Sequence, residues 1–246
     1  MKILITGHKG FIGQVLWEKL KNDHDLIGLD TNDGMDMQDC EIPDADAVIH
    51  LAGKSGVRQS FNDPGTFWNV NVNGSKRIFD HFKGKRILYA SSSTAYEPYL
   101  NPYANSKRVM EEIAPENSLG MRFHTVYSNN PREGMLLWLI QNNKLNYITE
   151  HSRDFIHVDD LCDAIIVLLK TDATGIVDIG MGESYSVKEL AELAGMKDLP
   201  IKPGMDSERQ KTQANKRDIE ILHKMGWKPK YNVKNFLTNE FISSTI

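Results

Sequence analysis

Cysteine and long hydrophobic runs are both scarce in this chain of 246 residues. Cys40 and Cys162 are its two cysteines, far apart and outside any metal-ligand spacing, so neither a disulfide framework nor a metal site is expected. The apolar run 164–169 is far too short to cross a bilayer, and residues 1–7 predict a strand and not a secretion signal. We therefore expect a soluble cytoplasmic protein without a membrane partner.

An excess of positive charge is also lacking. The chain has 29 Lys+Arg against 33 Asp+Glu, a formal net charge of -4. A nucleic-acid-binding surface needs a broad basic field, so nucleic acid is not an expected partner. Repeats and low-complexity tracts are missing as well, which argues against a solenoid or an array.

Short apolar runs alternate with amphipathic segments along the first half of the chain. The runs at residues 2–6, 25–30, 47–52 and 86–91 predict strands. Helices are predicted after residue 10, over about residues 66–82, and from Pro102 onward. Uninterrupted apolar strands alternating with such helices are typical of a parallel sheet covered on both faces. We therefore predict an α/β fold, a Rossmann-type doubly wound parallel sheet.

The pattern becomes less regular beyond Met121. A turn-rich stretch is followed by a helical segment at 135–141, a strand with a helix behind it at 155–170, and an amphipathic helix around Asp218 to Met225. We predict a small C-terminal substrate-binding lobe of about residues 125–150 and 181–246. Residues 1–124, with about 151–180, would form the nucleotide-binding domain.

The stretch "TGHKGFIG" places Gly7, Gly10 and Gly13 between the first predicted strand and the first helix. A tight turn, a close approach to pyrophosphate and close helix packing each exclude a β-carbon at these positions. The helix N-terminus would then offer N–H groups and a partial positive charge to phosphates. This context predicts a dinucleotide site.

Asp30 ends the second predicted strand, at the distance from the glycines that a dinucleotide site requires. A carboxylate there accepts hydrogen bonds from the adenosine ribose and repels a 2′-phosphate, so NAD is favoured over NADP. Lys9 is the one basic residue of the loop that could weaken this preference. Asp36 and Met37 either flank the adenine or belong to an ordinary surface turn.

Tyr103 and Lys107 lie four residues apart on a predicted helix and therefore share one face. An ammonium beside a phenol favours the phenolate, so we expect Lys107 to lower the pKa of Tyr103 toward the range of a general acid/base. Ser92 follows a predicted strand, at the sheet edge where ligands bind. Each residue alone is common at such a position, and it is their combination with the glycine loop that predicts catalysis.

These motifs resemble the extended short-chain dehydrogenase/reductases, and among them the NAD-dependent nucleotide-sugar epimerases and dehydratases. The resemblance runs nearly end to end. It rests on "TGHKGFIG", "HLAG", "NVNVNGSKRIFD", "YANSK", "RDFIHVDDLCDAI" and "DIGMGESYSVKELAEL".

The resemblance implies a tightly held NAD and a role for each matching residue. Tyr103 would be the acid/base, Lys107 would contact the nicotinamide ribose and the tyrosine, and Ser92 would contact the sugar hydroxyl. Further cofactor contacts are implied for the loop and for the end of the third strand: Phe11, Ile12, Leu51, Ala52 and Gly53. The helices near residues 66–82 and 102–115 would pair across a two-fold axis in a homodimer, although their amphipathic pattern fits a monomer equally.

The segments 55–64 and 89–96 look most like those of UDP-hexose and UDP-glucuronate 4-epimerases. The dehydratases carry an Asp-Glu pair where this chain has Ser93 and Thr94, so 4,6-dehydration is not expected. Ser93, Thr94 and Arg58 either face the sugar or serve in turn packing. Arg153 matches the family arginine that binds the nucleotide's phosphates, with Arg209 a second candidate, although a structural salt bridge would explain either.

The expected function is therefore NAD-dependent 4-epimerisation of a UDP-sugar, a hexose or a hexuronate, through a 4-keto intermediate. Two alternatives remain: an NAD(P)H-dependent keto-sugar reductase and a non-catalytic NAD-binding sensor. The stretch between Ser92 and Tyr103 is shorter than in most epimerases, and Thr125, Ser128 and Glu97 depart from the family pattern. These departures leave the identity of the sugar open.

Overall fold

The structure is a computed structural model, and it describes residues 1–238. It divides into two compact units. Unit 1 contains Met1–Phe123 and Leu168–Asp178, and unit 2 contains His124–Val167 and the residues from Ile179 onward. Residues 151–167, which the sequence assigned to the nucleotide-binding domain, lie in unit 2. The predicted domain limits themselves stay a prediction.

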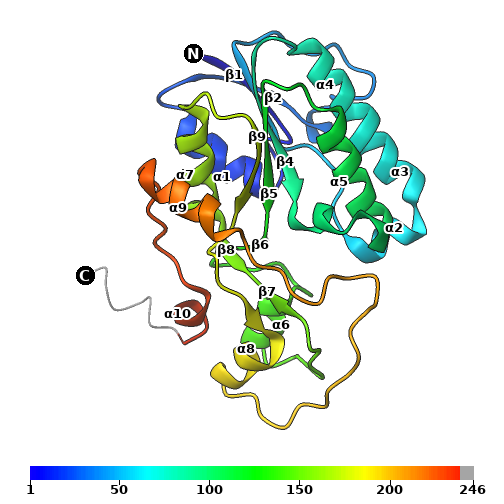
Figure 1. The fold of residues 1–246 in the computed structure, drawn as a ribbon, viewed down its shortest axis with the longest axis vertical. Helices are drawn as coiled ribbons and strands as arrows, with labels where there is room; N and C mark the ends of the chain where they lie inside the picture. Colours follow the sequence, from blue (N-terminus) through cyan, green and yellow to red (C-terminus); the bar gives the residue numbers. More distant parts are fainter. Residues whose placement is uncertain (239–246) are drawn as a thin grey trace. The chain divides into compact units, whose positions relative to one another are not determined.

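Unit 1 is built around a six-stranded sheet of order β2-β1-β3-β4-β5-β9 (Figure 1). The pairs from β2 through β5 are parallel. The predicted α/β class with a parallel sheet is confirmed. Two strands, β5 and β9, were not predicted. The strands are β1 (Lys2–Thr6), β2 (Asp25–Leu29), β3 (Ala47–His50), β4 (Arg86–Ser92), β5 (Ser118–Phe123) and β9 (Gly175–Ile179).

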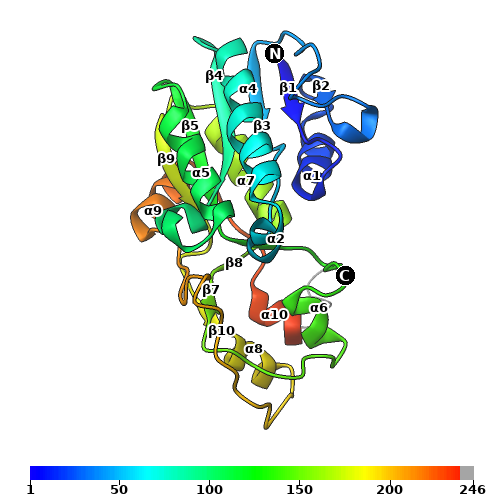
Figure 2. The same ribbon diagram turned by 90° about the vertical axis from the view of Figure 1, so that its right-hand side faces the viewer.

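Helices α4 and α5 lie side by side along the sheet of unit 1, where Figures 1 and 2 show them together. Large apolar side chains from the strands and from these helices form one core cluster, which includes Val48, Phe79, Tyr89 and Met110. The helices of unit 1 are α1 (Phe11–Leu20), α2 (Val57–Asn62), α3 (Pro64–Trp68), α4 (Ser75–His81) and α5 (Pro102–Ile113).

The single helix predicted over residues 66–82 is interrupted in the structure. A π-helical segment, η2 (Asn69–Gly74), separates α3 from α4. A wide turn of this kind is often found at functional sites. This segment contains Asn71, whose side chain is completely buried.

The described part of unit 2 contains short strands and the helices α6 to α10. Strand β6 (Thr125–Tyr127) pairs in parallel with β8 (Phe155–His157), and β7 (Ser152–Arg153) pairs antiparallel with β10 (Tyr185–Ser186). The helices predicted at 135–141, behind the strand at 155, and around 218–225 are confirmed. The helices are α6 (Leu136–Gln141), α7 (Val158–Leu169), α8 (Val187–Leu193), α9 (Lys216–Lys224) and α10 (Val233–Thr238).

Two buried aspartates hold the separated segments of unit 2 together. The carboxylate of Asp154 accepts hydrogen bonds from three backbone N–H groups, those of Met181, Gly182 and Ala214. The carboxylate of Asp160 accepts from the N–H groups of two residues that precede α10. Within residues 1–238, no helix combines the length and the apolar character needed to cross a membrane.

Candidate active site

The connection order of the sheet locates a ligand site in unit 1. Strands β2 and β3 flank β1 on opposite sides, so the winding of the chain reverses at β1. In sheets of this type, ligands bind beyond the carboxyl ends of the strands at such a reversal. The glycine loop follows β1, and the segment Leu51 to Gly53 follows β3. The structure thus brings two of the predicted cofactor-binding segments to one place.

Gly7 and Gly13 of the loop are packed where a side chain would not fit. Gly7 has φ +70°, and a β-carbon on it would lie 2.8 Å from the Ala52 nitrogen. A β-carbon on Gly13 would lie 2.1 Å from the Gly7 carbonyl oxygen. Gly10 is the N-cap of α1, and among the described residues no side chain caps that helix. A bare, close-packed helix N-terminus suits the pyrophosphate of a dinucleotide.

Phe11 and Ile12 form the first turn of α1, directly after the glycine loop. The ring of Phe11 is half exposed, with 52% of its surface accessible. Helix α1 therefore begins with a half-exposed apolar side chain directly after the glycine loop, as expected for a residue that contacts a cofactor. Their contact with NAD stays a prediction.

Asp30 lies where the sequence placed it, at the end of β2 beside the glycine loop. Its buried carboxylate accepts hydrogen bonds from the Lys9 nitrogen (3.0 Å) and the Asn32 nitrogen (2.9 Å). A carboxylate has about four acceptor positions, so ribose hydroxyls can still be bound. The Lys9 ammonium forms an ion pair with Asp33. The one basic side chain of the loop is therefore already neutralised by a second carboxylate, a setting that suits NAD better than NADP.

The structure places Met37 in the core of unit 1, where 4% of it is exposed. A β-carbon on Gly74 would lie 2.8 Å from the Met37 terminal methyl carbon, so the two residues are in close contact. The carboxylate of Asp36 accepts a hydrogen bond from the Gln38 nitrogen at 2.9 Å. Core packing thus accounts for Met37, and the proposed contact of either residue with adenine stays a prediction.

His50 connects the strands beneath the site. Its Nδ1 lies 2.6 Å from the Thr6 hydroxyl, and its Nε2 lies 2.9 Å from the Ser75 hydroxyl. The Thr6 oxygen also accepts a hydrogen bond from the Ala52 nitrogen, at 3.1 Å. Burial, and then the charge of Lys107, lower the pKa of His50 to about 3. A neutral imidazole therefore ties β1, β3 and α4 together at the physiological range of pH.

Asn71 is a site residue that the sequence analysis missed. Its amide nitrogen donates to the Lys54 carbonyl (3.0 Å) and to the Ser106 hydroxyl (2.9 Å), and its oxygen accepts from the Lys54 nitrogen (2.8 Å). A β-carbon on Gly53 would lie 3.0 Å from that oxygen and 3.3 Å from the Lys107 nitrogen. Asn71 therefore holds the segment after β3 against the helix that carries Lys107. An asparagine inside a predicted helix was the available signal.

Helix α5 begins where the sequence predicted. The Asn101 side chain accepts a hydrogen bond from the Ala104 nitrogen at 2.7 Å, and Pro102 occupies the first turn. This start places Tyr103 at the beginning of the helix, where its phenol hydrogen-bonds with the Ser92 side chain. The Lys107 ammonium donates to the Ala90 carbonyl at 2.7 Å. Ser92, Tyr103 and Lys107 are thus brought together at the end of β4.

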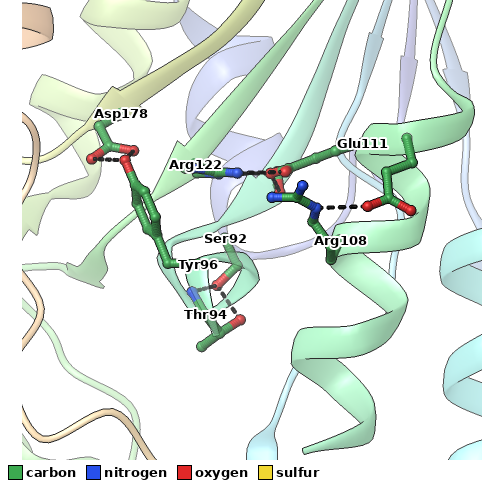
Figure 3. Close-up of polar contacts among 9 residues, drawn as sticks. Ser92, Thr94, Tyr96, Arg108, Glu111, Arg122 and Asp178 are labelled. Atoms are coloured by element: carbon green, nitrogen blue, oxygen red, sulfur yellow. Dashed lines mark hydrogen bonds and ion pairs between the residues drawn. The ribbon is translucent and has the colours of Figure 1, made fainter. Parts of the chain in front are cut away.

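The turn after β4 determines the direction of the Ser92 hydroxyl. Its oxygen accepts hydrogen bonds from the Thr94 nitrogen (3.2 Å) and the Thr94 hydroxyl (3.0 Å), as Figure 3 shows. With both donors on one oxygen, the single proton of Ser92 is available for Tyr103. A donor of this kind stabilises the phenolate. Thr94 therefore acts through Ser92, while Ser93 is buried in the same turn and Arg58 is exposed on α2.

The expected effect of Lys107 on the pKa of Tyr103 is wrong. Burial raises the pKa of Tyr103, opposed by the hydrogen bond from Ser92. Burial also lowers the pKa of Lys107 to about 8, opposed by the charge of Glu111. The reason is burial, which is the largest cause of both shifts and disfavours the charged form of each group.

Arg153 and Arg209, both in unit 2, are the predicted phosphate-binding residues. Arg153 lies on β7, where its guanidinium donates to the Gln210 carbonyl and forms an ion pair with Glu208 at 3.2 Å. Burial lowers the pKa of Arg153, Glu208 raises it, and the charge of Arg209 lowers it. The structure thus brings the two arginines near each other. Their role toward a diphosphate stays a prediction.

The described part of the chain contains no group of three or more His, Cys, Asp or Glu side chains arranged to hold a metal ion.

Comparison with known proteins identifies a family and several relatives of this chain. Residues 3–180 match the NAD dependent epimerase/dehydratase family. The chain is 30% identical to Protein CapI of Staphylococcus aureus, with 71% of each chain covered. It is 27% identical to the GDP-6-deoxy-D-mannose reductase of Pseudomonas aeruginosa, over 96% of this chain and 94% of that one. A solved UDP-glucuronic acid 4-epimerase from Bacillus cereus superposes with a TM-score of 0.82 at 20% identity, over 98% of both chains, a likeness of fold.

Proposed function

Because this chain belongs to the NAD-dependent epimerase/dehydratase family, we propose that it is a 4-epimerase acting on a UDP-sugar, a hexose or a hexuronate. The proposal depends on one observation: Ser92, Tyr103 and Lys107 lie together in the same unit as the glycine loop and Asp30. The glycine loop and the N-terminus of α1 suit a dinucleotide, in agreement with the NAD dependence of the family.

NAD, when bound, supplies a reversible hydride acceptor for the sugar C4. In the proposed reaction the Tyr103 oxygen, as phenolate, would take the proton of the 4-hydroxyl, and the loss of this proton together with hydride from C4 to the acceptor would leave a 4-keto sugar. Ser92 donates its one proton to Tyr103 before the sugar binds and would donate it to the reacting sugar oxygen once the sugar is in place. After the keto sugar has turned over, Tyr103 returns the proton, and C4 regains hydride on its opposite face. The steps consume no net oxidant.

The charge of Lys107 supports this proton exchange. Its ammonium lies at the end of β4 beside the Tyr103–Ser92 pair, held by the Ala90 carbonyl. With a pKa of about 8, Lys107 is mostly protonated at neutral pH. A positive charge at that place stabilises a phenolate in the course of the reaction, even though burial favours the phenol at rest.

The residues after Ser92 favour epimerisation over 4,6-dehydration. Ser93 and Thr94 carry no carboxyl group, and the Thr94 hydroxyl is already engaged with Ser92. We assign Ser93 and Arg58 to the sugar, Arg153 and Arg209 to the diphosphate, and a homodimer built on the helices near 66–82 and 102–115. The site of action would be the cytoplasm.

A keto-sugar reductase is the second candidate, because one relative, matched over 96% of this chain and 94% of its own, is named as a reductase. The two reactions differ in their need for reducing cofactor. Purified protein should interconvert UDP-glucose, UDP-glucuronate or UDP-N-acetylglucosamine at C4 with catalytic NAD. Stoichiometric consumption of NADH or NADPH would instead support reduction. Bound NAD without turnover on any UDP-, dTDP- or GDP-sugar would indicate a sensor.

Replacing Tyr103 by phenylalanine tests the acid/base directly. We expect turnover to fall by about 10²- to 10⁴-fold, the usual contribution of a positioned acid/base, while NAD binding is kept. Tyr99→Phe is the matched control, since Tyr99 is 79% exposed and precedes the same helix. Near-normal turnover of Tyr103→Phe would remove this residue from the mechanism.

A further inference from the structure

A buried ion pair lies next to the proposed catalytic residues without belonging to them. The Arg122 guanidinium donates to both oxygens of Glu111, at 2.8 and 2.7 Å. The side chains are 9% and 5% exposed. Burying two charges is costly unless the geometry is good and other hydrogen bonds complete it. This pair has such geometry, which raises the question of what it holds in place.

The pair joins four elements of unit 1, as Figure 3 shows. Glu111 lies on α5 and Arg122 on β5, and the Ser91 hydroxyl of β4 donates to Glu111 at 2.5 Å. The Tyr96 ring covers the Arg122 guanidinium at 4.1 Å. The Tyr96 hydroxyl in turn donates to Asp178 on β9 at 3.1 Å. The network therefore connects α5 with β4, β5 and β9 through the turn that follows Ser92.

One face of α5 contacts the last three residues of β4. Tyr103, Lys107 and Glu111 are spaced four apart, so they lie in one row along the helix. Their partners are three consecutive residues of β4: Ser92 for Tyr103, the Ala90 carbonyl for Lys107, and Ser91 for Glu111. Any slide or rotation of α5 that breaks the Glu111 contact also moves the other two.

Resting on the proposed function, we propose that Glu111 and Arg122 are positioning residues, which lock α5 onto the end of β4 and keep the Lys107 ammonium charged beside Tyr103. The Glu111 carboxylate is the anion in this row, one helical turn from Lys107. Arg122 holds that carboxylate in a single orientation. Neither residue contacts the reacting atoms in this mechanism.

The charged and titratable groups near Lys107 are consistent with this role. On α5, Glu111 raises the pKa of Lys107 against the effect of burial. From β3, His50 faces Lys107 as a neutral imidazole, since its pKa is about 3. Around Glu111 itself, Arg122 is the cation, and burial followed by the Glu111 charge raises the pKa of Tyr89, which keeps that phenol neutral.

Glu111→Gln removes the charge and keeps the shape of the side chain. We expect the pKa of Lys107 to fall by roughly one pH unit, the effect of losing one charge about a helical turn away. It is read from the ¹³Cε chemical shift of labelled lysine during a pH titration, with the signal assigned by its loss in Lys107→Met. The alkaline limb of turnover should move to lower pH by the same amount. A merely structural role would change the amount of active protein and leave both values in place.

Glu112→Gln is the matched control on the same helix. Glu112 is 57% exposed and forms an ion pair with Arg108 at 2.8 Å, so its removal should leave the Lys107 pKa and the alkaline limb unchanged. If Glu111→Gln fails to fold because Arg122 is left unpaired, the double variant Glu111→Gln/Arg122→Met removes both charges and should fold. Its Lys107 pKa should also fall, by less than in the single variant, because the positive charge of Arg122 is removed together with the negative charge of Glu111. An unchanged Lys107 pKa in either folded variant would overturn the proposal.

The titration uses protein alone, without cofactor or sugar nucleotide. If the wild type proves inactive on UDP-sugars, the proposed function fails, and the Lys107 pKa still decides whether Glu111 sets the charge of the lysine. If the wild type is active and the pKa of Lys107 does not respond to Glu111, the positioning role fails while the proposed function stands.

Discussion

Replacing Lys107 by methionine should make the protein more stable at neutral pH while removing the proposed activity. Burial lowers the pKa of Lys107 from 10.5 to about 8. Each pKa unit corresponds to about 1.4 kcal/mol, so keeping this ammonium buried costs about 3.5 kcal/mol of folding free energy. Its hydrogen bond to the Ala90 carbonyl returns about 1.5 kcal/mol. The variant should therefore gain about 1 to 2 kcal/mol at pH 7.

The pH dependence of this gain identifies its cause. The folded-state pKa lies below the unfolded one, so between about pH 8 and 10.5 the unfolded chain binds more protons at Lys107 than the folded chain. Wild-type stability therefore rises with pH across that window relative to the variant. The gain of Lys107→Met should be fully present at pH 7 and largely lost at pH 10. Urea unfolding followed by tryptophan fluorescence at both pH values measures it.

Lys76→Met is a suitable control for the loss of a lysine. Lys76 is 60% exposed on α4 and forms an ion pair with Asp80, so this variant should change stability by less than about 0.5 kcal/mol at either pH. The reasoning about Lys107 is refuted if Lys107→Met is no more stable than the wild type at pH 7, or if its gain persists unchanged at pH 10.

Three further outcomes are expected. Gly13→Ala should destabilise the protein by about 1 to 3 kcal/mol and abolish NAD binding, because the added β-carbon would lie 2.1 Å from a carbonyl oxygen. The control Gly65→Ala places its β-carbon in open space and should do neither, and calorimetry measures both effects. Asn71→Ala should cost about 2 to 3 kcal/mol in urea unfolding, since three hydrogen bonds are lost in a buried place. The folded-state pKa of His50 lies below the unfolded value, so stability should fall as pH drops from 6.5 toward 3, by up to about 1.4 kcal/mol per pH unit. His50→Gln should make this fall less steep. An equally steep fall in the variant would mean that other groups cause it.

The elements that carry the proposed cofactor site were predictable because their signals are local. The apolar runs of β1 to β4, the glycine loop, Asp30 and the Asn-Pro start of α5 each depend on a few neighbouring residues. The structure places these elements as expected, and it brings Ser92, Tyr103 and Lys107 together. Strand ends, helix starts and i,i+4 spacing carry this information without reference to the rest of the chain.

The tertiary structure decided whatever depends on burial or on contacts between distant segments. Strand β5 was missed because its apolar run is broken by Arg122, a charge that is tolerated there only because Glu111 pairs with it from α5. Strand β9 joins the sheet by pairing with β5, which lies far from it along the chain. Spacing put Lys107 next to Tyr103, but the direction of both pKa shifts followed from desolvation, which a sequence pattern does not contain.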